Sequence, residues 1–548
     1  MTFPQPFRYT NSNPWQPKKM KTSITLLALL FCIFDSYPQD PAIIWQKTIG
    51  GSDTDFSTVF QATTDGGYIL GGYSTSNISG EKTENSNGQI DIWIVKIDGS
   101  GNIQWQNTIG GAGDDYLISM QQTSDGGYIV GAGSDSNISG DKTENSRGGL
   151  DYWLLKLDAS GNITWQKTYG GNQPEFDTYI VETADGGYFV GGYSDSDVNG
   201  DKTDPTNGQR DFWALKLDSS GNIVWQNSIG GSLVDRPQAA FQTTDGGFII
   251  GGFSNSPSSG DKTENTRGGN DYWIVKLDAS GTLQWNRTFG GNDSDVFRDM
   301  IQLADGGYLV GGYSKSNISG DKTENSQGDY DAWILKLDSS GNMLWQNTIG
   351  GSGIDYPRDV IQLSDGTFMV ACWSNSNISG DKTQNSNGGY DYWLLKLNSA
   401  GGIISQNSIG GSADESGSYI LPTTDGNFAM FCSSDSNISG DKSENSRGLD
   451  DYWIFKTTPA ILGVSQSTFP LPISAYPNPT NGKFTINLGQ SYSETNVTIT
   501  NVLGQQISTS NYTNTQTLVV DINAAAGLYF ATLKTNDGNQ ATLKIVKQ

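Results

Sequence analysis

The chain has 548 residues, with 70 glycines, 11% aromatic residues and a formal net charge of −25. Such a negative surface disfavours nucleic acid and anionic membranes as partners, because both carry negative charge themselves. The absence of histidine and the small number of cysteines, three, exclude a Ser-His-Asp triad, a Cys-His dyad, histidine metal sites and a disulfide framework.

The N-terminal region has the pattern of an export signal. Lys18, Lys19 and Lys21 precede the apolar stretch Ile24–Phe34, which is followed by polar residues. A basic head and 11 apolar residues predict a secretory signal peptide that is too short to span a bilayer. Met20 begins a more typical signal than Met1 does, so we expect residues 1–19 to be an over-extended start and residues 20–39 to be the signal peptide. No other stretch of the sequence is apolar enough to predict a transmembrane segment.

A repeat of 60 residues runs through most of the chain. Tryptophans mark it at Trp93, Trp153, Trp213, Trp273, Trp333, Trp393 and Trp453. Aspartates in a turn follow the same step at Asp65, Asp125, Asp185, Asp245, Asp305, Asp365 and Asp425. These markers define seven units within residues 43–457, with no insertion or deletion between them.

Each unit contains four strand-like segments. In the first unit they are Phe56–Gln61, Tyr68–Ser74, Asp91–Asp98 and Ile103–Gly111. The Asp-Gly pair between the first two segments predicts a β-hairpin. The third segment is apolar on both faces, which is expected of a strand in a sheet that is covered on both sides.

Four short antiparallel strands repeated seven times predict an all-β fold, a seven-bladed β-propeller. An open solenoid is the alternative. The ends of the array favour a ring, because an extra strand at Ile43–Gly51 precedes the first unit, while the last unit stops after Asp451–Lys456. The extra strand would complete the last sheet and would remove two exposed sheet edges.

The order of the segments resembles a known group of repeats. The hairpin strand "DGGYLVGGYS" at Asp305–Ser314, the Asp-x-Trp strand and the "GN-I-x-W" strand resemble the sixty-residue tandem repeats of bacterial secreted proteins. Their layout is similar to that of WD-type propellers. The resemblance covers residues 43–457 and concerns the fold, since propellers host many activities. It implies that Phe56–Gln61 is the innermost strand of its blade, and that the long polar loop, as at Ser136–Ser146, opens on the same face as the short connection before that strand.

One acid recurs in the short connection that leads into the innermost strand. As a ring around the channel, these acids would bind a cation or a polar ligand: Asp55, Asp115, Glu175, Asp235, Asp295, Asp355 and Glu415. Hard cations such as calcium prefer several carboxylate oxygens. The alternative is that each acid accepts backbone N–H groups at the start of its strand. Because the sequence has no Asp-x-Asp-x-Asp-Gly loop, we expect no cofactor and keep calcium as a hypothesis.

Two further charge patterns recur in every unit. In the long loop an acid precedes a lysine, as at Asp141 and Lys142, and these pairs either form a ligand-binding rim or remain solvated on a loop that folds on itself. In the third strand an aspartate precedes the tryptophan and a lysine follows it, as at Asp151 and Lys156. A lysine inside an apolar strand needs a partner, so we predict structural ties there.

The likeness of the units argues against catalysis. Two carboxylates suffice for glycoside hydrolysis, but they must lie in different environments. No acid is unique among the units, so we expect that the protein is not an enzyme and keep a carboxylate-based, glycan-active enzyme as the alternative.

The composition changes after Thr457. Residues 458–472 form a proline-containing linker, and residues 473–548 contain roughly seven alternating strand-like segments, which are typical of a small β-sandwich. This segment closely resembles the type A C-terminal sorting domain of the type IX secretion system through "YPNPTNGKF", "NVLGQQI", "AAGLYFATL" and "KIVKQ". The matching motif residues are Pro477, Asn478, Pro479, Gly482, Gly504, Gly527 and Tyr529.

The resemblance to the sorting domain implies a route for the chain. A signal peptide would take it to the periplasm, the type IX machinery would carry it across the outer membrane, and a sortase would cut it in the linker. The mature protein would be secreted or held on the outer cell surface of a Bacteroidetes-type bacterium.

These patterns together predict an exported propeller that acts as an adhesion or ligand-binding module, with a glycan or a protein as its ligand. Seven like sites would raise avidity if one ligand spans them. A glycan-active enzyme that uses loop carboxylates and a scaffold without a ligand are the alternatives.

Overall fold

The computed structural model describes residues 43–458, 473–501, 506–525, 527–536 and 539–548. All 33 regular elements in these ranges are β-strands. The described part of the chain therefore contains no helix that could cross a membrane. The predicted over-extended start, the signal peptide and all of the linker except its first residue lie outside the described residues.

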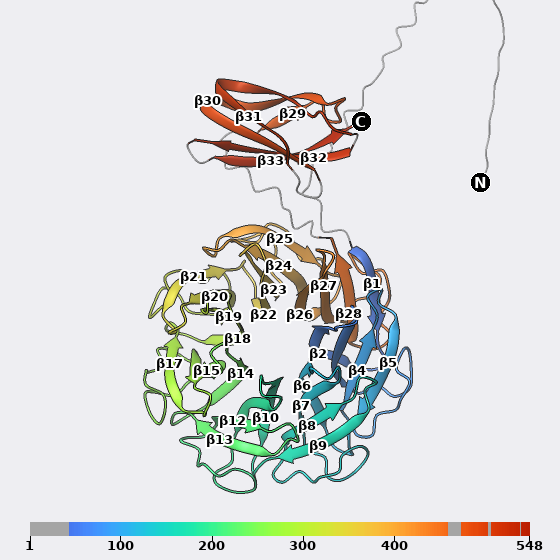
Figure 1. Cartoon of the computed structure of the whole chain (residues 1–548), viewed down its shortest axis with the longest axis vertical. Helices are drawn as coiled ribbons and strands as arrows, with labels where there is room; N and C mark the ends of the chain where they lie inside the picture. Colours follow the sequence, from blue (N-terminus) through green and yellow to red (C-terminus); the bar gives the residue numbers. More distant parts are fainter. Residues whose placement is uncertain (1–42, 459–472, 502–505, 526, 537–538) are drawn as a thin grey trace, which may run out of the picture. The chain divides into compact units, whose positions relative to one another are not determined.

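Residues 43–457 form seven four-stranded antiparallel sheets around a ring (Figure 1). The innermost strands are β2 (Asp55–Ala62), β6 (Asp115–Gln122), β10 (Glu175–Glu182), β14 (Asp235–Gln242), β18 (Asp295–Gln302), β22 (Asp355–Gln362) and β26 (Glu415–Pro422). The second strands are β3 (Tyr68–Ser74), β7 (Tyr128–Ser134), β11 (Tyr188–Ser194), β15 (Phe248–Ser254), β19 (Tyr308–Ser314), β23 (Phe368–Ser374) and β27 (Phe428–Ser434).

The other two strands of each blade lie further from the centre of the ring (Figure 1). The third strands are β4 (Asp91–Ile97), β8 (Asp151–Leu157), β12 (Asp211–Leu217), β16 (Asp271–Leu277), β20 (Asp331–Leu337), β24 (Asp391–Leu397) and β28 (Asp451–Thr457). The outer strands are β5 (Ile103–Ile109), β9 (Ile163–Tyr169), β13 (Ile223–Ile229), β17 (Leu283–Phe289), β21 (Met343–Ile349), β25 (Ile403–Ile409) and β1 (Ile43–Ile49).

The ring closes through its first strand. β1 pairs antiparallel with β28, so that Trp45 lies opposite Lys456 and Ile49 lies opposite Tyr452. The last blade therefore has the strand order β1-β28-β27-β26. The first and last blades also touch, because the Tyr452 hydroxyl donates to the carbonyl oxygen of Trp93 over 3.1 Å. The extra strand at the start of the array thus completes the last blade, and the predicted seven-bladed propeller is confirmed.

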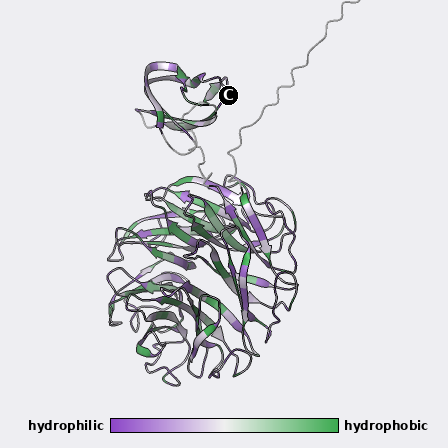
Figure 2. Cartoon of the chain, turned by 45° about the vertical axis from the view of Figure 1, so that its right-hand side comes forward, coloured by the Kyte–Doolittle hydropathy of each residue, from purple (hydrophilic) through white to green (hydrophobic). Residues whose placement is uncertain are grey.

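The hydrophobic core lies between the blades. Seven clusters of buried residues each span two neighbouring blades, one for every junction. The tryptophans of the third strands are 0% exposed in these clusters: Trp93, Trp153, Trp213, Trp273, Trp333, Trp393 and Trp453. Figure 2 shows hydrophobic residues along the strands and hydrophilic residues in many of the loops. Because each sheet is packed on both faces, its third strand is apolar on both faces as well.

The third-strand lysines pair with the turn aspartates of the same blade. Lys96 Nζ lies 2.9 Å from Asp65 Oδ2, and the same ion pair occurs in all seven blades. The aspartate at the other end of the strand has a different role, since Asp151 accepts the backbone N–H of Arg147 over 2.6 Å. Both charged positions of the third strand therefore hold local structure together.

The long polar loop is a structural part of each blade. In the second blade, the carboxylate of Asp141 accepts the backbone N–H of Gly110 in the preceding blade over 3.1 Å. The backbone N–H of Asp141 also donates to the Gly110 carbonyl oxygen over 2.9 Å. The loop of one blade thus bonds the blade before it, which explains why the chain repeats this polar segment with every blade.

The C-terminal region forms a five-stranded sheet. Its strands are β29 (Ser474–Tyr476), β30 (Lys483–Asn501), β31 (Gln506–Asp521), β32 (Gly527–Thr535) and β33 (Gln540–Lys547). The long β30 pairs with β31 along most of its length, with β29 near its start and with β32 near its end. Within the described residues, five strands therefore account for the roughly seven segments that the sequence suggested.

The sorting-motif residues lie at turns and strand ends of this sheet. Pro477 and Pro479 flank Asn478, whose Oδ1 accepts the N–H of Val546 over 2.8 Å. Gly482 has a φ of 123°, a conformation that favours glycine, and it directly precedes β30. Gly527 begins β32. Tyr529 is 5% exposed and its hydroxyl donates to the carbonyl oxygen of Ala525 over 2.7 Å. Gly504 lies outside the described residues.

Candidate functional site in the central channel

The seven acids that were predicted to ring the channel begin the innermost strands and are buried. All are 0% exposed: Asp55, Asp115, Glu175, Asp235, Asp295, Asp355 and Glu415. Each accepts the backbone N–H of the glycine four residues earlier, and for Asp55 the distance from Gly51 N to Oδ2 is 2.6 Å. This contact fits the alternative in which the acids satisfy backbone groups. No group of three or more potential metal-ligand side chains occurs in the described residues, and the calcium hypothesis stays a prediction.

A second buried acid, from the preceding blade, lies beside each of these acids. A Cβ atom on Gly170 would meet Asp151 Oδ1 at 2.3 Å and Glu175 Oε2 at 2.8 Å, so both carboxylates lie against the same glycine. Asp151 Oδ1 has no hydrogen-bond partner in the described part of the chain. We name these pairs the junction acids: Asp91–Asp115, Asp151–Glu175, Asp211–Asp235, Asp271–Asp295, Asp331–Asp355, Asp391–Glu415 and Asp451–Asp55.

Burial raises the pKa of the third-strand member of each junction pair. It raises the pKa of Asp151 to about 7, and the charge of Glu175 adds to the effect. It raises the pKa of Asp211 and that of Asp271 to about 7 in the same way. At neutral pH these carboxyl groups are therefore close to half-protonated. Protonation neutralises part of the negative charge that burial disfavours.

The long-loop lysines do not form a rim around the channel. All seven are only 1–2% exposed: Lys82, Lys142, Lys202, Lys262, Lys322, Lys382 and Lys442. The ammonium group of Lys82 donates to the carbonyl oxygen of Glu84 over 2.9 Å and to the hydroxyl of Thr108 over 2.8 Å. The hypothesis of a ligand-binding rim and the alternative of solvated pairs are both wrong for these lysines, because the loop folds over each ammonium group.

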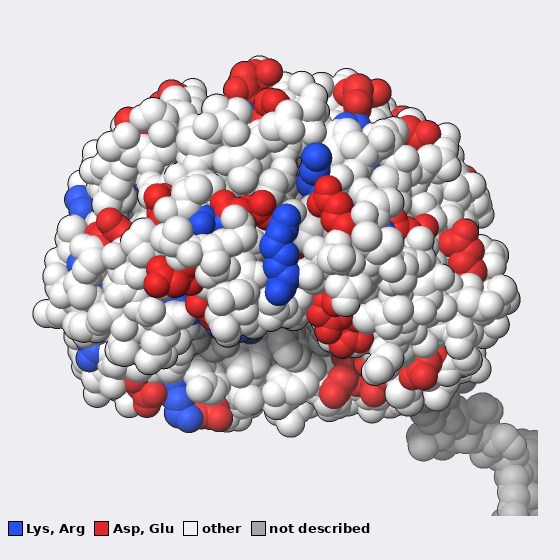
Figure 3. Space-filling view, turned by 90° about the horizontal axis from the view of Figure 1, so that it is seen from below, with Lys and Arg blue, Asp and Glu red and all other residues white. Residues whose placement is uncertain are grey.

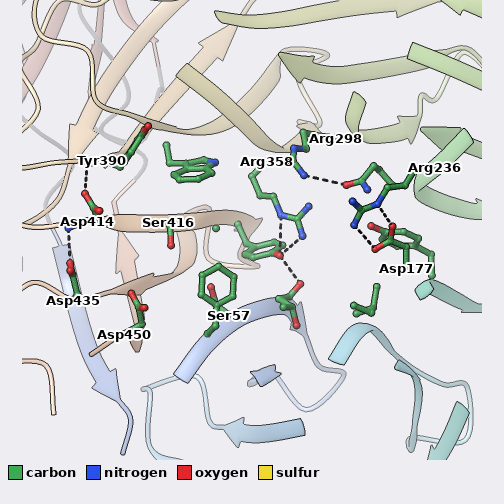
Figure 4. Close-up of a pocket in the computed structure, with 18 residues that line it drawn as sticks. Ser57, Asp177, Arg236, Arg298, Arg358, Tyr390, Asp414, Ser416, Asp435 and Asp450 are labelled. Atoms are coloured by element: carbon green, nitrogen blue, oxygen red, sulfur yellow. Dashed lines mark hydrogen bonds and ion pairs between the residues drawn. The ribbon is translucent and has the colours of Figure 1, made fainter. Parts of the chain in front are cut away.

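The innermost strands enclose two cavities that meet inside the channel. The larger one, shown in Figure 4, has a volume of about 580 Å³, and the smaller one has about 380 Å³. Seven residues, one from each innermost strand, line both cavities. We call this set the waist: Thr58, Ile118, Tyr179, Gln238, Arg298, Arg358 and Tyr419.

A β-bulge occurs at the waist in the innermost strands. In β2 the pairing register with β3 shifts between Ser57 and Val59, which leaves Thr58 out of the ladder. The register breaks at the corresponding place in the other six blades, and the break leaves out one residue in β6, β14, β18 and β22 and two residues in β10 and β26. A bulged residue is unpaired and its side chain is re-aimed, so the bulge explains why the waist residues of the five blades with one skipped residue face the channel.

Two blades present a tyrosine at the waist instead of the bulged residue. Asp177 in β10 and Gly417 in β26 have φ values of 57° and 73°, in the left-handed region. The next residue in β10, Thr178, is turned toward the preceding blade, where its hydroxyl donates to a carbonyl oxygen of β7 over 3.0 Å. Tyr179 and Tyr419, one residue further along, line the channel in these blades.

Three arginines lie along one wall of the larger cavity (Figure 4). Arg236 is neutralised, because it forms an ion pair with Asp177 in which Nη2 lies 3.1 Å from Oδ1. Arg298 and Arg358 occupy the same repeat position in adjacent blades. Within the part of the chain that the structure describes, neither of them forms an ion pair with a carboxylate.

Neutral groups hold the two waist arginines. Arg358 Nη2 and Nε donate to the Tyr419 hydroxyl over 2.7 and 3.1 Å, and this hydroxyl donates in turn to the carbonyl oxygen of Thr58 over 2.6 Å. Arg298 Nη1 donates to Gln238 Oε1 over 3.3 Å. Each guanidinium has five N–H donors, so both retain donors for a further group.

Two acids that follow these arginines in sequence do not cancel their charge. The carboxylate of Asp299 accepts the backbone N–H of Val360 over 2.9 Å, and that of Asp359 accepts the backbone N–H of Ile420 over 2.8 Å. Burial, together with the charge of Asp299, raises the pKa of Asp359 to about 8. Burial also raises the pKa of Asp299, and within the described residues neither acid lies within ion-pair distance of Arg298 or Arg358.

Besides the two waist tyrosines, three aromatic side chains line the larger cavity directly: Phe56, Trp373 and Tyr390. Phe56 stacks on Tyr73 with 5.3 Å between ring centroids, and Trp373 lies 5.2 Å from Tyr356 and 4.9 Å from Tyr390. The three rings Phe56, Trp373 and Tyr390 that line the cavity are half-buried, and we call them the aromatic collar. Three acids also line this cavity, Asp414, Asp435 and Asp450, on the side away from the arginines (Figure 4).

The exterior of the propeller contrasts with the waist. Figure 3 shows acidic side chains spread over one side of the molecule, with few basic side chains among them. This distribution agrees with the net charge of −25. Arg298 and Arg358, two of the three described arginines without an ion pair, thus line the channel of a protein that is acidic as a whole.

The waist does not follow from what the seven units share. At the repeat position of Thr58 the units carry Thr, Ile, Thr, Gln, Arg, Arg and Ser, whereas the tryptophan and turn-aspartate positions are identical. The variation between units at this repeat position is the signal in the sequence that could have indicated the waist.

Comparisons with known proteins identify the C-terminal region. Residues 474–548 match a family model described as "Secretion system C-terminal sorting domain". This segment is a type IX sorting domain, as its motifs predicted. It marks the chain for secretion and export to the cell surface.

Other comparisons cover a larger share of the chain. Regulatory protein FlaEY of Caulobacter vibrioides is 24% identical over 365 residues, which are 59% of this chain and 37% of that protein. The structure of BBS1N in complex with ARL6DN has a TM-score of 0.42 at 10% identity, over 77% of this chain and 98% of that chain. The Pan2 WD40 domain of Neurospora crassa has a TM-score of 0.39 at 10% identity, over 76% of this chain and 95% of that chain. These likenesses carry no argument about function.

Proposed function

We propose that the propeller of this exported protein binds a glycan at the mouth of its central channel. The observation that carries the proposal is the aromatic collar, whose half-buried rings border a cavity of about 580 Å³ with a polar waist. Ligand sites typically combine apolar and aromatic walls with a few placed polar groups, and this volume lies within their usual range. Aromatic rings stack on the apolar faces of sugars, while polar side chains bond their hydroxyls.

The proposal places one site at the centre of the molecule and not seven equivalent sites on the loops. The seven long loops resemble one another because they bond neighbouring blades, and their lysines are buried. The waist and the collar differ from blade to blade, which is what one asymmetric ligand requires.

We also propose that this site binds without catalysis. The acids near it already accept local hydrogen bonds: Asp414 accepts the N–H of Tyr390 over 2.9 Å, and Asp435 accepts the N–H of Asp414 over 2.6 Å. Asp299 and Asp359 bond the backbone of adjacent strands. After export, a sortase would remove the sorting domain within residues 458–472 and leave the propeller free or attached to the cell surface.

A glycan array probed with the full chain tests the proposal. We expect the chain to bind a subset of the glycans, and Trp373→Ala to weaken this binding about tenfold through loss of stacking. Trp225→Ala is the matched control, because Trp225 lies in the outer strand β13, and it should leave binding unchanged. Failure to bind any glycan, or an equal loss in both variants, would refute the proposal, and release of new reducing ends from a bound polysaccharide would refute the absence of catalysis.

A further inference from the structure

The waist holds two cationic groups that the protein leaves without a carboxylate partner. Five other described arginines form ion pairs: Arg147, Arg210, Arg236, Arg267 and Arg447. Arg298 and Arg358 line both cavities but take part in none of these pairs. Among the described arginines, Arg287 in the outer strand β17 also forms no ion pair, but only Arg298 and Arg358 combine this lack with a place in the cavities, in a chain with 58 acidic and 33 basic residues.

The surroundings of the two arginines hold the guanidinium groups in place without neutralising them. The Tyr419 hydroxyl receives two N–H groups of Arg358, and its ring centroid lies 5.2 Å from that guanidinium. Arg298 lies 5.2 Å from the ring centroid of Tyr313 and donates to Gln238. Planar guanidinium groups with free N–H donors match the geometry of a carboxylate.

The other wall of the larger cavity offers the opposite chemistry. Asp414 and Asp435 are exposed at the mouth, where their carboxylate oxygens can accept hydrogen bonds from hydroxyl groups. Trp373 and Tyr390 of the collar border the same cavity. A ligand that fits all three features carries a negative group at one end, a ring in the middle and hydroxyl groups at the other end.

We propose that the waist binds the carboxylate of a uronic-acid saccharide through Arg298 and Arg358, with a sugar ring against Trp373 and Tyr390. The inference rests on the proposed glycan-binding function and deepens it by naming the chemical class of the sugar. One terminal uronate enters the channel, because the acidic exterior repels a long polyanion that would lie along the surface.

Isothermal titration of the full chain with digalacturonate and diglucuronate tests this inference. We expect at least one of the two to bind, its methyl ester to bind at least tenfold more weakly, and binding to weaken as the salt concentration rises. Arg298→Gln and Arg358→Gln should each weaken binding of the acid by about 10-fold to 100-fold, with little effect on the ester. Arg287→Gln is the control, because Arg287 lies in the outer strand β17 and should leave the affinity unchanged.

The outcomes separate this inference from the proposed function. If an acid and its ester bind equally well, the carboxylate inference fails while the glycan proposal stands. If neither acid binds but neutral glycans do, the carboxylate inference also fails and the glycan proposal also stands. If no saccharide binds, both fail. If sodium sulfate at equal ionic strength displaces the uronate more strongly than sodium chloride does, the waist is a general anion site and the inference fails.

Near-ultraviolet circular dichroism checks that each variant is folded, and its spectrum must match that of the wild-type chain. A loss of affinity with an altered spectrum counts against the inference, unless Arg358→Lys restores part of the affinity.

Discussion

The blade junctions and the channel waist are built by the same seven units, but they use them in opposite ways. At the junctions, every unit supplies the same side chain to the same contact, as Trp93 and Trp153 do in successive blades. At the waist, the corresponding residue changes from blade to blade, from Thr58 to Arg298 and Arg358. The residues that all units share form the ring, and the residues that differ between units line its central channel.

The difference has a physical cause. The rotations from blade to blade must add up to one full turn for the ring to close, and the same contact at every junction achieves this. A side chain at the waist faces a cavity instead of a neighbouring blade and is free of this constraint. Variation between units of one chain therefore indicates where a closed repeat protein has room for binding residues.

The largest expected effect comes from the tryptophan at the closing junction. Trp93 packs against the last blade, with Phe431 and Ile454 in its cluster, while Trp153 packs against the first. Replacement of either by alanine should lower the free energy of unfolding by about 3–5 kcal/mol, because both side chains are fully buried. Denaturant unfolding measures both values. A cost for Trp93→Ala far below that of Trp153→Ala would mean that the ring is open.

The ring itself could be predicted from the sequence, because its determinants repeat. The fixed step of the tryptophans defined the blades, and the extra strand near Trp45 predicted the closure with β28. The waist could not be predicted in the same way. Its geometry depends on a bulge in every innermost strand and on the left-handed backbone of Asp177. No residue type in the sequence predicts either feature.

The junction acids predict how stability depends on pH. The pKa values of Asp151, Asp211 and Asp271 are raised to about 7 in the folded protein, from an ordinary value near 4. A raised pKa stabilises the fold fully below pH 4, and this contribution is lost as the pH rises through 7. We expect the melting temperature to fall by several degrees between pH 5 and pH 8.

Thermal unfolding at the two pH values measures this effect, and Asp211→Asn provides the matched variant. The amide cannot ionise, so the fall between pH 5 and pH 8 should become smaller. A melting temperature that rises over this range, or an unchanged fall in the variant, would contradict the assignment of raised pKa values to the junction acids.

A smaller effect is expected from the paired turn aspartates. Asp125 Oδ2 lies 2.9 Å from Lys156 Nζ, and hydrogen bonds from Lys156 and Thr123 lower the pKa of Asp125 to about 2. Because the aspartate is mostly exposed, Asp125→Asn should lower the free energy of unfolding by only about 0.5–1 kcal/mol at pH 7. A lowered pKa stabilises the fold above pH 4, and this contribution is lost as the pH falls toward 2, so the variant and the wild-type chain should converge in acid.

The smallest expected effect is that of calcium. No group of three or more ligand side chains occurs in the described residues, so we expect added Ca²⁺ to leave the melting temperature at pH 8 unchanged. A rise in the melting temperature on addition of Ca²⁺ that is absent from Asp211→Asn would instead support the calcium hypothesis. It would place the ion between two junction acids.

The central claim is that the departures from the repeat, and not the repeated loops, bind the ligand. A crystal structure of the full chain with the uronate disaccharide that binds more tightly tests this claim most directly. We predict one saccharide in the channel, with its carboxylate against Arg298 and Arg358. Saccharide bound on the long loops of several blades, with none at the waist, would contradict the account.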